Sequence, residues 1–441
     1  MWTYYPDLLA TPVPRYTSYP TAAEFHDAVG EAQQRAALER VGADEPISLY
    51  VHIPYCHDIC WYCGCNTGRA NRVHRLQVYL DRLHEEMATV ARLLGGRGKV
   101  ARVSFGGGSP NAISAPQFAD LVGALRGAFS IDPDSVWSVE IDPRGFEPAF
   151  ADAIGAAGFA RASLGVQTFD PAIQAAIGRV QPRDVIDRAV AMLRDAGVAS
   201  LNMDLMYGLP GQGEAELADS IDQAIACGAD RLAVFGYAHV PAMIPRQRRI
   251  DASALPDARQ RFAMAEMASA RLRNLGWTAI GFDHFARPGD PLAVAAPAGQ
   301  VRRNFQGFTD DPCDTMIGLG ASAISRFAGA LVQNEHNSGR YGMRVAAGEL
   351  AGSRGIATPR AERRRAFLIE RMLANGAADI SAIVDQPGVR DRLAPFLDRG
   401  LARLADGWLT LRPEAAPYAR SIAAIFDPWR QASRRTFSSA V

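Results

Sequence analysis

The sequence predicts an α/β protein whose main part is a partial or full parallel (β/α) barrel. Short apolar runs alternate with segments of helical periodicity from about residue 47 to 283, which is typical of a parallel sheet. Polar and glycine residues follow the ends of these runs, where parallel barrels build their sites. We expect an N-terminal arm over the barrel mouth (1–45), the barrel (46–345) and a smaller, mainly helical C-terminal domain (346–441).

The individual elements follow from this alternation. Seven short apolar runs are predicted strands: Ile47–Ile53, Val100–Phe105, Val136–Ile141, Ala160–Leu164, Ser200–Leu205, Arg231–Phe235 and Thr278–Phe282. Four segments between them have apolar residues at helical spacing: Val73–Leu94, Pro116–Phe129, Arg183–Ala196 and Glu214–Cys227. The C-terminal domain is predicted to contain helices Pro359–Leu373 and Val389–Leu404, a strand Trp408–Leu411 and a helix Ala415–Phe426.

Composition narrows the class of protein. The net charge is zero, with 47 basic and 47 acidic residues, which argues against a nucleic-acid partner. The first residues lack the pattern of a secretory signal, and no uncharged apolar stretch is long enough to span a membrane. Six cysteines are too few and too clustered for a disulfide scaffold of 441 residues, so we expect reduced thiols and a cytoplasmic location. We also expect a monomer, although the sequence does not determine the oligomeric state.

Four of the six cysteines, Cys56, Cys60, Cys63 and Cys65, fall within ten positions just after the first predicted strand. The spacing indicates three ligands to one metal centre and a fourth thiol. Three thiolates leave one iron of an iron-sulfur cluster open to a substrate or cofactor. Zinc is the main alternative, but structural zinc sites usually pair two distant cysteine knuckles. Cys65 is either an inert residue or a thiol that exchanges a proton or hydrogen atom at the barrel mouth.

Other polar residues lie at the predicted strand ends. Gly106–Pro110 is either a tight turn or a place where the backbone approaches a ligand, and it lacks the lysine of a phosphate-binding loop. Gly318–Ala323 imitates a dinucleotide-binding loop without its acidic partner, so a close-approach loop is the better interpretation. The mixture of carboxylates, amide and guanidinium suits a zwitterionic amino acid and a ribose; the residues are Glu140, Gln167, Arg179 and Asp204.

The cysteine spacing, with Tyr62 before the third cysteine, resembles the signature of the radical SAM (S-adenosylmethionine) superfamily. Within it, the sequence is similar to the oxygen-independent coproporphyrinogen III oxidases from about residue 13 to Phe437. The segments that carry the closer resemblance are Arg15–Pro20, Tyr50–Pro54, Cys63–Asn66, Glu140–Arg144, Gly165–Gln167, Asp204–Pro210, Tyr237–His239, Asp283–Pro288 and Asn304–Gly307.

The resemblance implies cofactors and residue roles. Cys56, Cys60 and Cys63 would bind a [4Fe–4S] cluster whose open iron holds SAM, and two SAM molecules would share the site. The implied SAM contacts are Tyr50, Tyr62, Gly107, Gly108, Ser109, Glu140, Gln167, Arg179, Asp204, Ala238 and Ile324, the last two on the side of the second SAM. Our own hypotheses are that Cys65, Glu140 and His52 are catalytic and that Arg15 and Tyr19 contact the substrate.

The implied reaction belongs to porphyrin and haem biosynthesis. Two propionate side chains of coproporphyrinogen III would lose CO2 and become the vinyl groups of protoporphyrinogen IX. A 5′-deoxyadenosyl radical would take a hydrogen atom from each, and an electron donor and an electron acceptor would complete the oxidation. Two alternatives use the same scaffold: a haem-binding chaperone and a radical SAM methyltransferase of another tetrapyrrole. Cys63–Asn66 and Arg15–Pro20 favour the decarboxylase.

Overall fold

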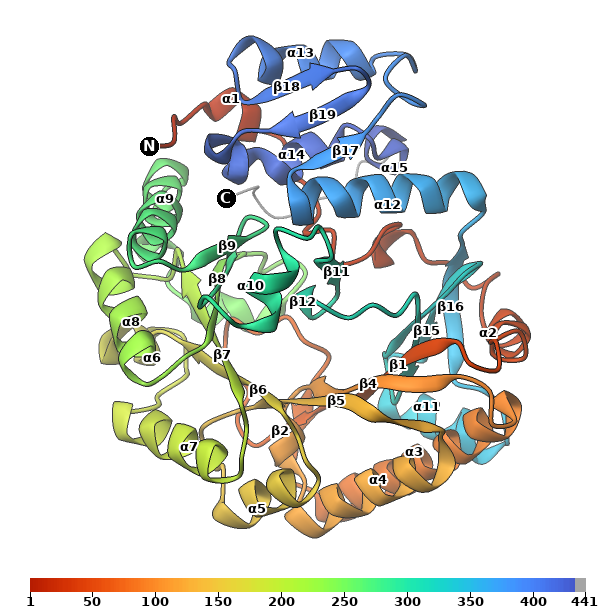
Figure 1. Cartoon of the computed structure of the whole chain (residues 1–441). Helices are drawn as coiled ribbons and strands as arrows, with labels where there is room; N and C mark the ends of the chain where they lie inside the picture. The colour runs from red at the N-terminus through yellow and green to blue at the C-terminus, as the bar shows by residue number, and fades with distance from the viewer. Residues whose placement is uncertain (433–441) are drawn as a thin grey trace.

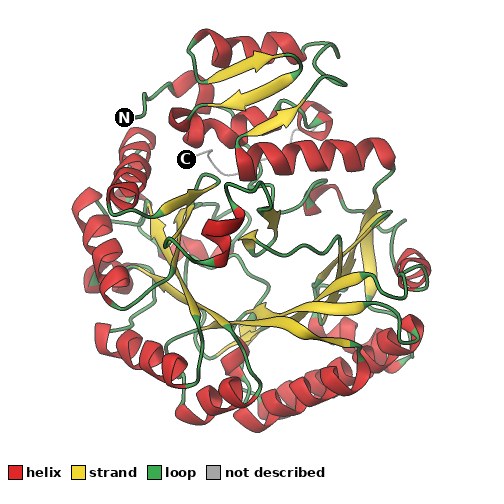
Figure 2. Ribbon diagram, in the orientation of Figure 1, coloured by secondary structure: helices red, strands yellow, loops and turns green. Residues whose placement is uncertain are grey.

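A twelve-stranded, strongly curved sheet forms the centre of the computed structural model, which describes residues 1–432 (Figures 1 and 2). Phe437, the expected end of the family resemblance, lies outside these residues. Six neighbouring strands are parallel and follow in chain order: β1 (Pro46–Ile53), β4 (Lys99–Gly107), β5 (Ile131–Ile141), β6 (Arg161–Gln167), β7 (Ser200–Tyr207) and β8 (Arg231–Gly236). The predicted α/β class is confirmed, and the barrel is partial because the two edge strands do not pair.

Helices cover the outer, convex side of this sheet (Figure 2). They are α3 (Val73–Leu94), α4 (Ala115–Ala128), α5 (Pro148–Ala156), α6 (Pro171–Ala176), α7 (Arg183–Asp195), α8 (Glu214–Ala226) and α9 (Ala258–Asn274). The sequence predicted α3, α4, α7 and α8 to within a few residues, because each carries an apolar stripe at helical spacing.

The seventh predicted strand is wrong in its direction. Thr278–Phe282 was expected to continue the parallel sheet, but β9 (Thr278–Ile280) pairs antiparallel with β10 (His284–Ala286), and β10 pairs antiparallel with β8. A parallel return requires a crossover of a dozen or more residues, whereas only three residues separate β9 from β10. Gly281 makes this tight turn with φ +59°, in the region that glycine favours.

The opposite edge of the sheet was not predicted. Here β13 (Thr315–Leu319) lies parallel to β1 and starts an antiparallel series. Its other members are β14 (Ile324–Phe327), β15 (Ala330–Asn334) and β16 (Gly352–Ala357), with α11 (Ser338–Ala346) between the last two. Smaller elements complete this part of the chain: α1 (Pro6–Leu9), α2 (Glu31–Leu38), β2 (Tyr55–Cys56), β3 (Gly68–Arg69), α10 (Pro291–Ala295), β11 (Arg302–Asn304) and β12 (Gly307–Thr309).

The C-terminal part combines helices with a separate three-stranded sheet. Its elements are α12 (Arg360–Asn375), β17 (Ala377–Asp379), α13 (Val389–Asp398), β18 (Ala402–Ala405), β19 (Trp408–Leu411), α14 (Ala419–Ala424) and α15 (Pro428–Ala432). The predicted helix Val389–Leu404 is too long, because Gly400 at φ +65° turns the chain into β18. The boundaries at residues 45 and 345 remain predictions, and because β16 pairs with β15 we propose moving the second one to follow Ala357.

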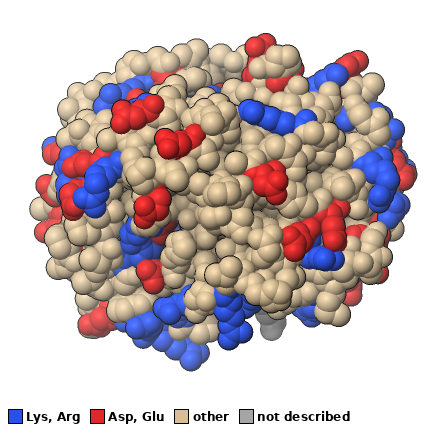
Figure 3. All heavy atoms as spheres, turned by 90° about the horizontal axis from the view of Figure 1, so that it is seen from below, with Lys and Arg blue, Asp and Glu red and all other residues tan. Residues whose placement is uncertain are grey.

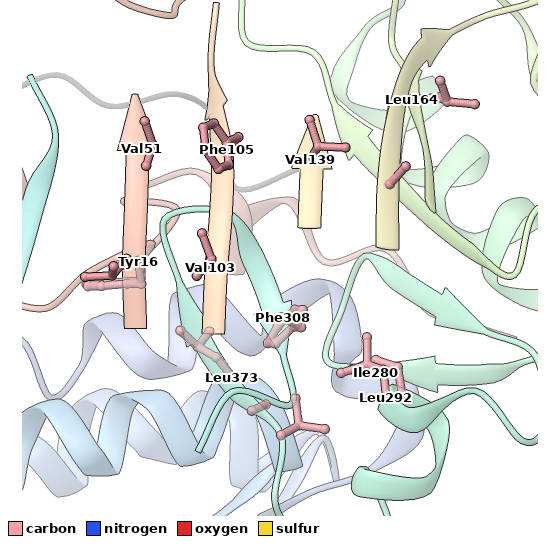
Figure 4. Close-up of a cluster of buried hydrophobic side chains, with 14 of the residues drawn as sticks. Tyr16, Val51, Val103, Phe105, Val139, Leu164, Ile280, Leu292, Phe308 and Leu373 are labelled. Carbon is pink, nitrogen blue, oxygen red and sulfur yellow. The ribbon is translucent and has the colours of Figure 1, made fainter. Parts of the chain in front are cut away.

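Alternation along the parallel strands separates an apolar outer layer from a polar interior. Phe105, Val139 and Leu164 are buried on the outer side of neighbouring strands (Figure 4), with Phe105 directly opposite Val139. Burying each such side chain contributes about 1.5–3 kcal/mol. The intervening positions are polar and paired by the register, for example Ser104 opposite Ser138. A polar barrel interior is unusual for a packed core and indicates a place for a ligand.

Acidic and basic side chains both occur on the face seen in Figure 3, with basic side chains grouped along its lower edge, and the net charge of the chain is zero. Within residues 1–432, none of the helices combines the length and the hydropathy needed to cross a bilayer.

Candidate active site

The cysteine loop is tied down at both ends. It begins at β2, and β2 pairs in parallel with β3, so that Cys56 lies opposite Arg69. In the middle of the loop, the Trp61 backbone N–H donates to the Ile177 carbonyl at 3.1 Å. Its indole fills the space above Gly178, where a Cβ would lie 2.6 Å from the ring. These contacts hold the cysteine loop in one conformation, although it has little regular secondary structure of its own.

Each of the three predicted ligand sulfurs accepts a hydrogen bond from outside the set. The donors are Thr67 Oγ1 to Cys56 at 3.2 Å, Arg144 Nη2 (3.3 Å) and Arg179 Nη1 (3.2 Å) to Cys60, and the Cys65 N–H to Cys63 at 3.4 Å. Such donors stabilise thiolates and adjust the potential of an iron-sulfur cluster. The donor set therefore fits a cluster, and Cys65 contributes a backbone N–H to it.

The thiols do not converge on a single ion. Among residues 1–432, no three His, Cys, Asp or Glu side chains are arranged to hold one metal ion. Zinc requires its ligands within about 2.0–2.3 Å of one point. A cluster spreads its cysteines over separate irons, so this arrangement gives no support to the zinc alternative.

The three glycines at the end of β4, Gly106 to Gly108, are required by the groups that pack against them. A Cβ on Gly106 would lie 2.7 Å from the Glu140 carboxyl, and one on Gly107, at φ +118°, 2.7 Å from the His52 ring. A Cβ on Gly108 would lie 2.5 Å from the Tyr55 carbonyl oxygen. The loop thus brings bare backbone to the side chains of two predicted catalytic residues.

Glu140 is the central acid of the site. It lines an interior cavity of about 180 Å³, which Asp204, Asn202 and Ser163 also line. The Gly107 N–H donates to Glu140 Oε2 at 3.2 Å, and Gln306 Nε2 donates to Oε1 at 3.3 Å. Burial raises the pKa of Glu140 to about 7 and also raises that of Asp204. Two poorly solvated carboxyls facing one cavity favour a ligand that brings donors or positive charge.

Arg179 does not point freely at a ligand. It forms an ion pair with Asp142 (3.1 Å), and its Nε donates to the Gly165 carbonyl at 3.1 Å. Arg144 binds the other side of Asp142 at 2.7 Å. Although burial alone would raise it, the two guanidiniums hold the pKa of Asp142 below its usual value. Gln167, at φ +72°, lies over Gly165 beside Arg179.

His52 is buried and neutral. Its Nδ1 is 3.1 Å from the Tyr50 hydroxyl and its Nε2 is 3.4 Å from the Ser322 hydroxyl, so both ring nitrogens have partners. Burial lowers the pKa of His52 to about 4. The Tyr50 ring packs edge-on against Phe305, with 4.4 Å between centroids. His52 is therefore available as a neutral hydrogen-bonding group at physiological pH.

Three further predicted SAM contacts, Ser109, Tyr62 and Ala238, already have partners inside the protein. The Ser109 hydroxyl donates to Asn111 and accepts from the Asp142 N–H at 3.1 Å. The Tyr62 carbonyl accepts from Gln247 Nε2 at 2.9 Å, and the same amide group donates to the Ala238 carbonyl at 3.0 Å. Their roles toward SAM remain predictions.

The loop Gly318–Ala323 is held from behind by α3. The Gly320 N–H donates to Glu86 Oε2 at 2.6 Å, Tyr341 donates to the same oxygen at 2.7 Å, and Asn334 Nδ2 donates to Oε1 at 2.7 Å. Burial raises the pKa of Glu86 to about 7. The hydrogen bonds to Glu86 give the loop around Gly320 a structural role that requires no bound dinucleotide.

The remaining predicted residues lie in two other cavities. Arg15 and Ala238 line one cavity at the end of β8, where Arg15 Nη2 donates to the Gly236 carbonyl at 2.5 Å. Tyr19 and Ile324 line another, between the N-terminal arm and α12, and the Tyr19 hydroxyl donates to Glu362 at 2.9 Å. The residues expected near the second SAM are thus divided between two cavities.

Three residues next to the predicted ligands were not identified from the sequence. Thr67 donates to Cys56, Arg144 donates to Cys60, and Asp142 accepts from Arg144; no local spacing indicates these contacts. A signal was nevertheless present, because Asp142 and Arg144 belong to the segment Glu140–Arg144 that resembles the family.

Comparison with known proteins decides the family. The radical SAM superfamily matches residues 50–224. The oxygen-independent coproporphyrinogen III oxidase of Bradyrhizobium diazoefficiens is 39% identical, over 97% of each chain, and that of Paracoccus denitrificans is 40% identical, over 96% of this chain and 95% of its own. The chain belongs to the oxygen-independent coproporphyrinogen III oxidase family. It also superposes on coproporphyrinogen III oxidase (HemN) from Escherichia coli, a radical SAM enzyme, with a TM-score of 0.90 at 35% identity over 97% and 99% of the two chains.

Proposed function

We propose that this chain is a radical SAM oxidoreductase that removes CO2 from two propionate side chains of coproporphyrinogen III and leaves the vinyl groups of protoporphyrinogen IX. The observation that carries the proposal is the cysteine loop. Its three thiols accept hydrogen bonds from outside the set, and it follows the strand that carries Tyr50 and His52, beside the glycines that contact Glu140. Two relatives that are 39% and 40% identical over nearly their full length are named oxygen-independent coproporphyrinogen III oxidase, and this supports the proposed reaction and substrate.

Cys56, Cys60 and Cys63 would hold the [4Fe–4S] cluster. When bound, the cluster and SAM supply the one-electron chemistry needed to take a hydrogen atom from an unactivated carbon. Arg144 and Arg179 would stabilise the thiolate of Cys60 through their hydrogen bonds.

The polar interior would bind SAM. Glu140 and Asp204 offer acceptor oxygens to the hydroxyls of a ribose or to an ammonium group, and the poor solvation of both carboxyls strengthens such bonds. Ala238 and Ile324 are our proposed contacts to a second SAM, and Cys65, Glu140 and His52 our proposed catalytic residues.

Each propionate must lose one hydrogen atom, one CO2 and one further electron to become a vinyl group. The chain therefore requires an electron donor to start the reaction and an acceptor to finish it. We propose a monomer acting in the cytoplasm, where the thiols that hold the cluster stay reduced.

One assay tests this function against its alternatives. The protein is reconstituted anaerobically with iron and sulfide, reduced, and given SAM and coproporphyrinogen III. We expect protoporphyrinogen IX, with two 5′-deoxyadenosine molecules per product, and no product from a Cys60→Ser variant. Haem binding without decarboxylation would instead indicate a chaperone, and a methylated tetrapyrrole a methyltransferase.

A further inference from the structure

An arginine-rich cavity lies where the end of β8, α9 and α14 come together (Figure 1). Three guanidiniums line it, those of Arg15, Arg261 and Arg420, and the only carboxylate among the lining residues is Asp283. That carboxylate is already engaged, because the Asp283 Oδ1 lies 2.7 Å from His284 Nδ1. The cavity therefore carries an excess of positive charge.

A fourth arginine, Arg303, adds to this charge from the adjacent wall. It is 7% exposed, and its guanidinium lies 4.9 Å from the ring of Phe282, which also lines the cavity. Arg303 donates to the carbonyls of Tyr16 (3.1 Å) and Arg15 (3.1 Å), and so ties the N-terminal arm to this wall.

These arginines differ from the other arginines near the barrel interior. Arg161, Arg179 and Arg231 each form an ion pair with an aspartate, at 2.6, 3.1 and 2.8 Å. Within residues 1–432, Arg15, Arg261 and Arg303 have no such pair and donate only to backbone carbonyls. Two of their buried nitrogens, Arg261 Nε and Arg303 Nη1, have no hydrogen-bond partner there.

Burying like charges together is unfavourable. Burial and the neighbouring Arg15 lower the pKa of Arg261, and burial lowers that of Arg303. A bound anion would relieve this repulsion and fill the vacant donors, and the flat fork of a guanidinium matches a carboxylate.

We propose that this cavity binds a propionate carboxylate of the substrate, through Arg15 and Arg261 with Arg303 behind them. The inference rests on the proposed function, and it adds Arg261 of α9 and Arg303 of β11 to Arg15, one of the two arm residues that the sequence analysis assigned to the substrate. Ala238, a proposed SAM contact, lines the same cavity, so a propionate held here would keep the porphyrinogen beside the reacting centre. The carboxylate of SAM is the other possible source of this chemistry.

The test compares Arg15→Gln and Arg261→Gln with Arg273→Gln, a control at the exposed end of the same helix α9. In the reconstituted enzyme we expect each cavity variant to raise the KM for coproporphyrinogen III roughly 10–100-fold, with little change in kcat and in the KM for SAM. Arg273→Gln should behave as wild type.

Binding of coproporphyrin III, followed by fluorescence, gives a readout that does not depend on turnover. The variants should weaken its binding by the same factor, but leave binding of its tetramethyl ester, which lacks the carboxylates, unchanged. Equal KM values, or an equal loss for acid and ester, would overturn the proposal, and a rise in the KM for SAM alone would assign the cavity to SAM. If wild type binds coproporphyrin III but does not decarboxylate coproporphyrinogen III, the proposed function fails while the binding comparison still decides the site.

Discussion

Two glycine loops of this protein each donate a backbone N–H to a buried glutamate, yet they have different surroundings. Gly107 donates to Glu140 and Gly320 donates to Glu86, and burial raises the pKa of both acids to about 7. Glu86 accepts three hydrogen bonds of 2.6–2.7 Å from the protein and lines none of the described cavities. Glu140 accepts two weaker ones, of 3.2 and 3.3 Å, and faces a cavity.

The comparison shows what separates a supporting acid from an acid that is available for a ligand. The same local motif, a glycine N–H on a carboxylate, serves both. The number and length of the remaining hydrogen bonds decide the role, because a carboxylate that is already saturated gains nothing from a ligand. We therefore expect Glu86 to act on stability and Glu140 on activity.

The largest effect should come from Glu86→Ala. The substitution leaves the Gly320 N–H, the Tyr341 hydroxyl and the Asn334 amide without their acceptor in a buried place. We expect the free energy of unfolding, measured by anaerobic urea denaturation, to fall by about 3–5 kcal/mol. Glu85→Ala is the control, since Glu85 is exposed and forms only a surface ion pair with Arg82. Equal losses of unfolding free energy in the two variants would show that the hydrogen bonds of Glu86 do not stabilise the fold.

Gly320→Ala should destabilise by about 2–4 kcal/mol. A Cβ there would lie 2.5 Å from the Tyr79 hydroxyl and 2.6 Å from the His52 carbonyl, at φ +97°. Gly276→Ala isolates the backbone cost, because Gly276 has φ +80° and nothing within 4 Å of the added carbon. It should lose only about 1–2 kcal/mol in the same measurement. The difference between the two variants measures how tightly the loop is packed against its support.

Glu140→Gln should leave the fold intact and impair the reaction. The amide keeps the size of the side chain but replaces one acceptor oxygen, so we expect kcat/KM for SAM to fall roughly 10–100-fold, or about 1.4–2.7 kcal/mol. The urea midpoint should change little. Glu147→Gln, an exposed change just before α5, should alter neither quantity. If the Glu140→Gln variant lost stability but kept its kcat/KM, Glu140 would have a structural role like that of Glu86.

The parallel part of the fold was predictable because its signals are local. Apolar runs and helical stripes identify β1 and α3 within a short window, and strand ends locate Glu140 and Asp204 on one face. The antiparallel edges were not predictable, since they depend on turns such as that at Gly281 and on pairing between distant segments.

The site divides in the same way. Spacing alone selected the cysteines, whereas the partners of Cys60 lie 84 and 119 residues away, at Arg144 and Arg179. The sequence also gave no sign that Glu86 accepts from Gly320, a contact across 234 residues. Such partners become visible only when the register of the sheet brings them together.

The smallest expected effect is the part of the pH dependence of stability that comes from Glu86; the part from Glu140, whose pKa is also raised to about 7, is common to wild type and a Glu86 variant. Because burial raises the pKa of Glu86 from 4.5 to about 7, the folded state keeps a proton that the unfolded state releases. The stabilisation from this proton is complete below about pH 4.5 and is lost as the pH rises through about 7. Between pH 5 and 7 the loss should be about 2 kcal/mol.

Glu86→Gln carries no such proton. We would measure the free energy of unfolding of wild type and variant in urea at pH 5, 6, 7 and 8. The two plots of this free energy against pH should converge or cross as the pH rises and run parallel above pH 8. The slope is the quantity to compare, because the amide also changes the pH-independent hydrogen bonding to Asn334 and Tyr341. Parallel curves over the whole range would mean that the three donors keep Glu86 ionised. In that case Glu86 would differ from Glu140 both in its charge and in the number and length of the hydrogen bonds that it accepts.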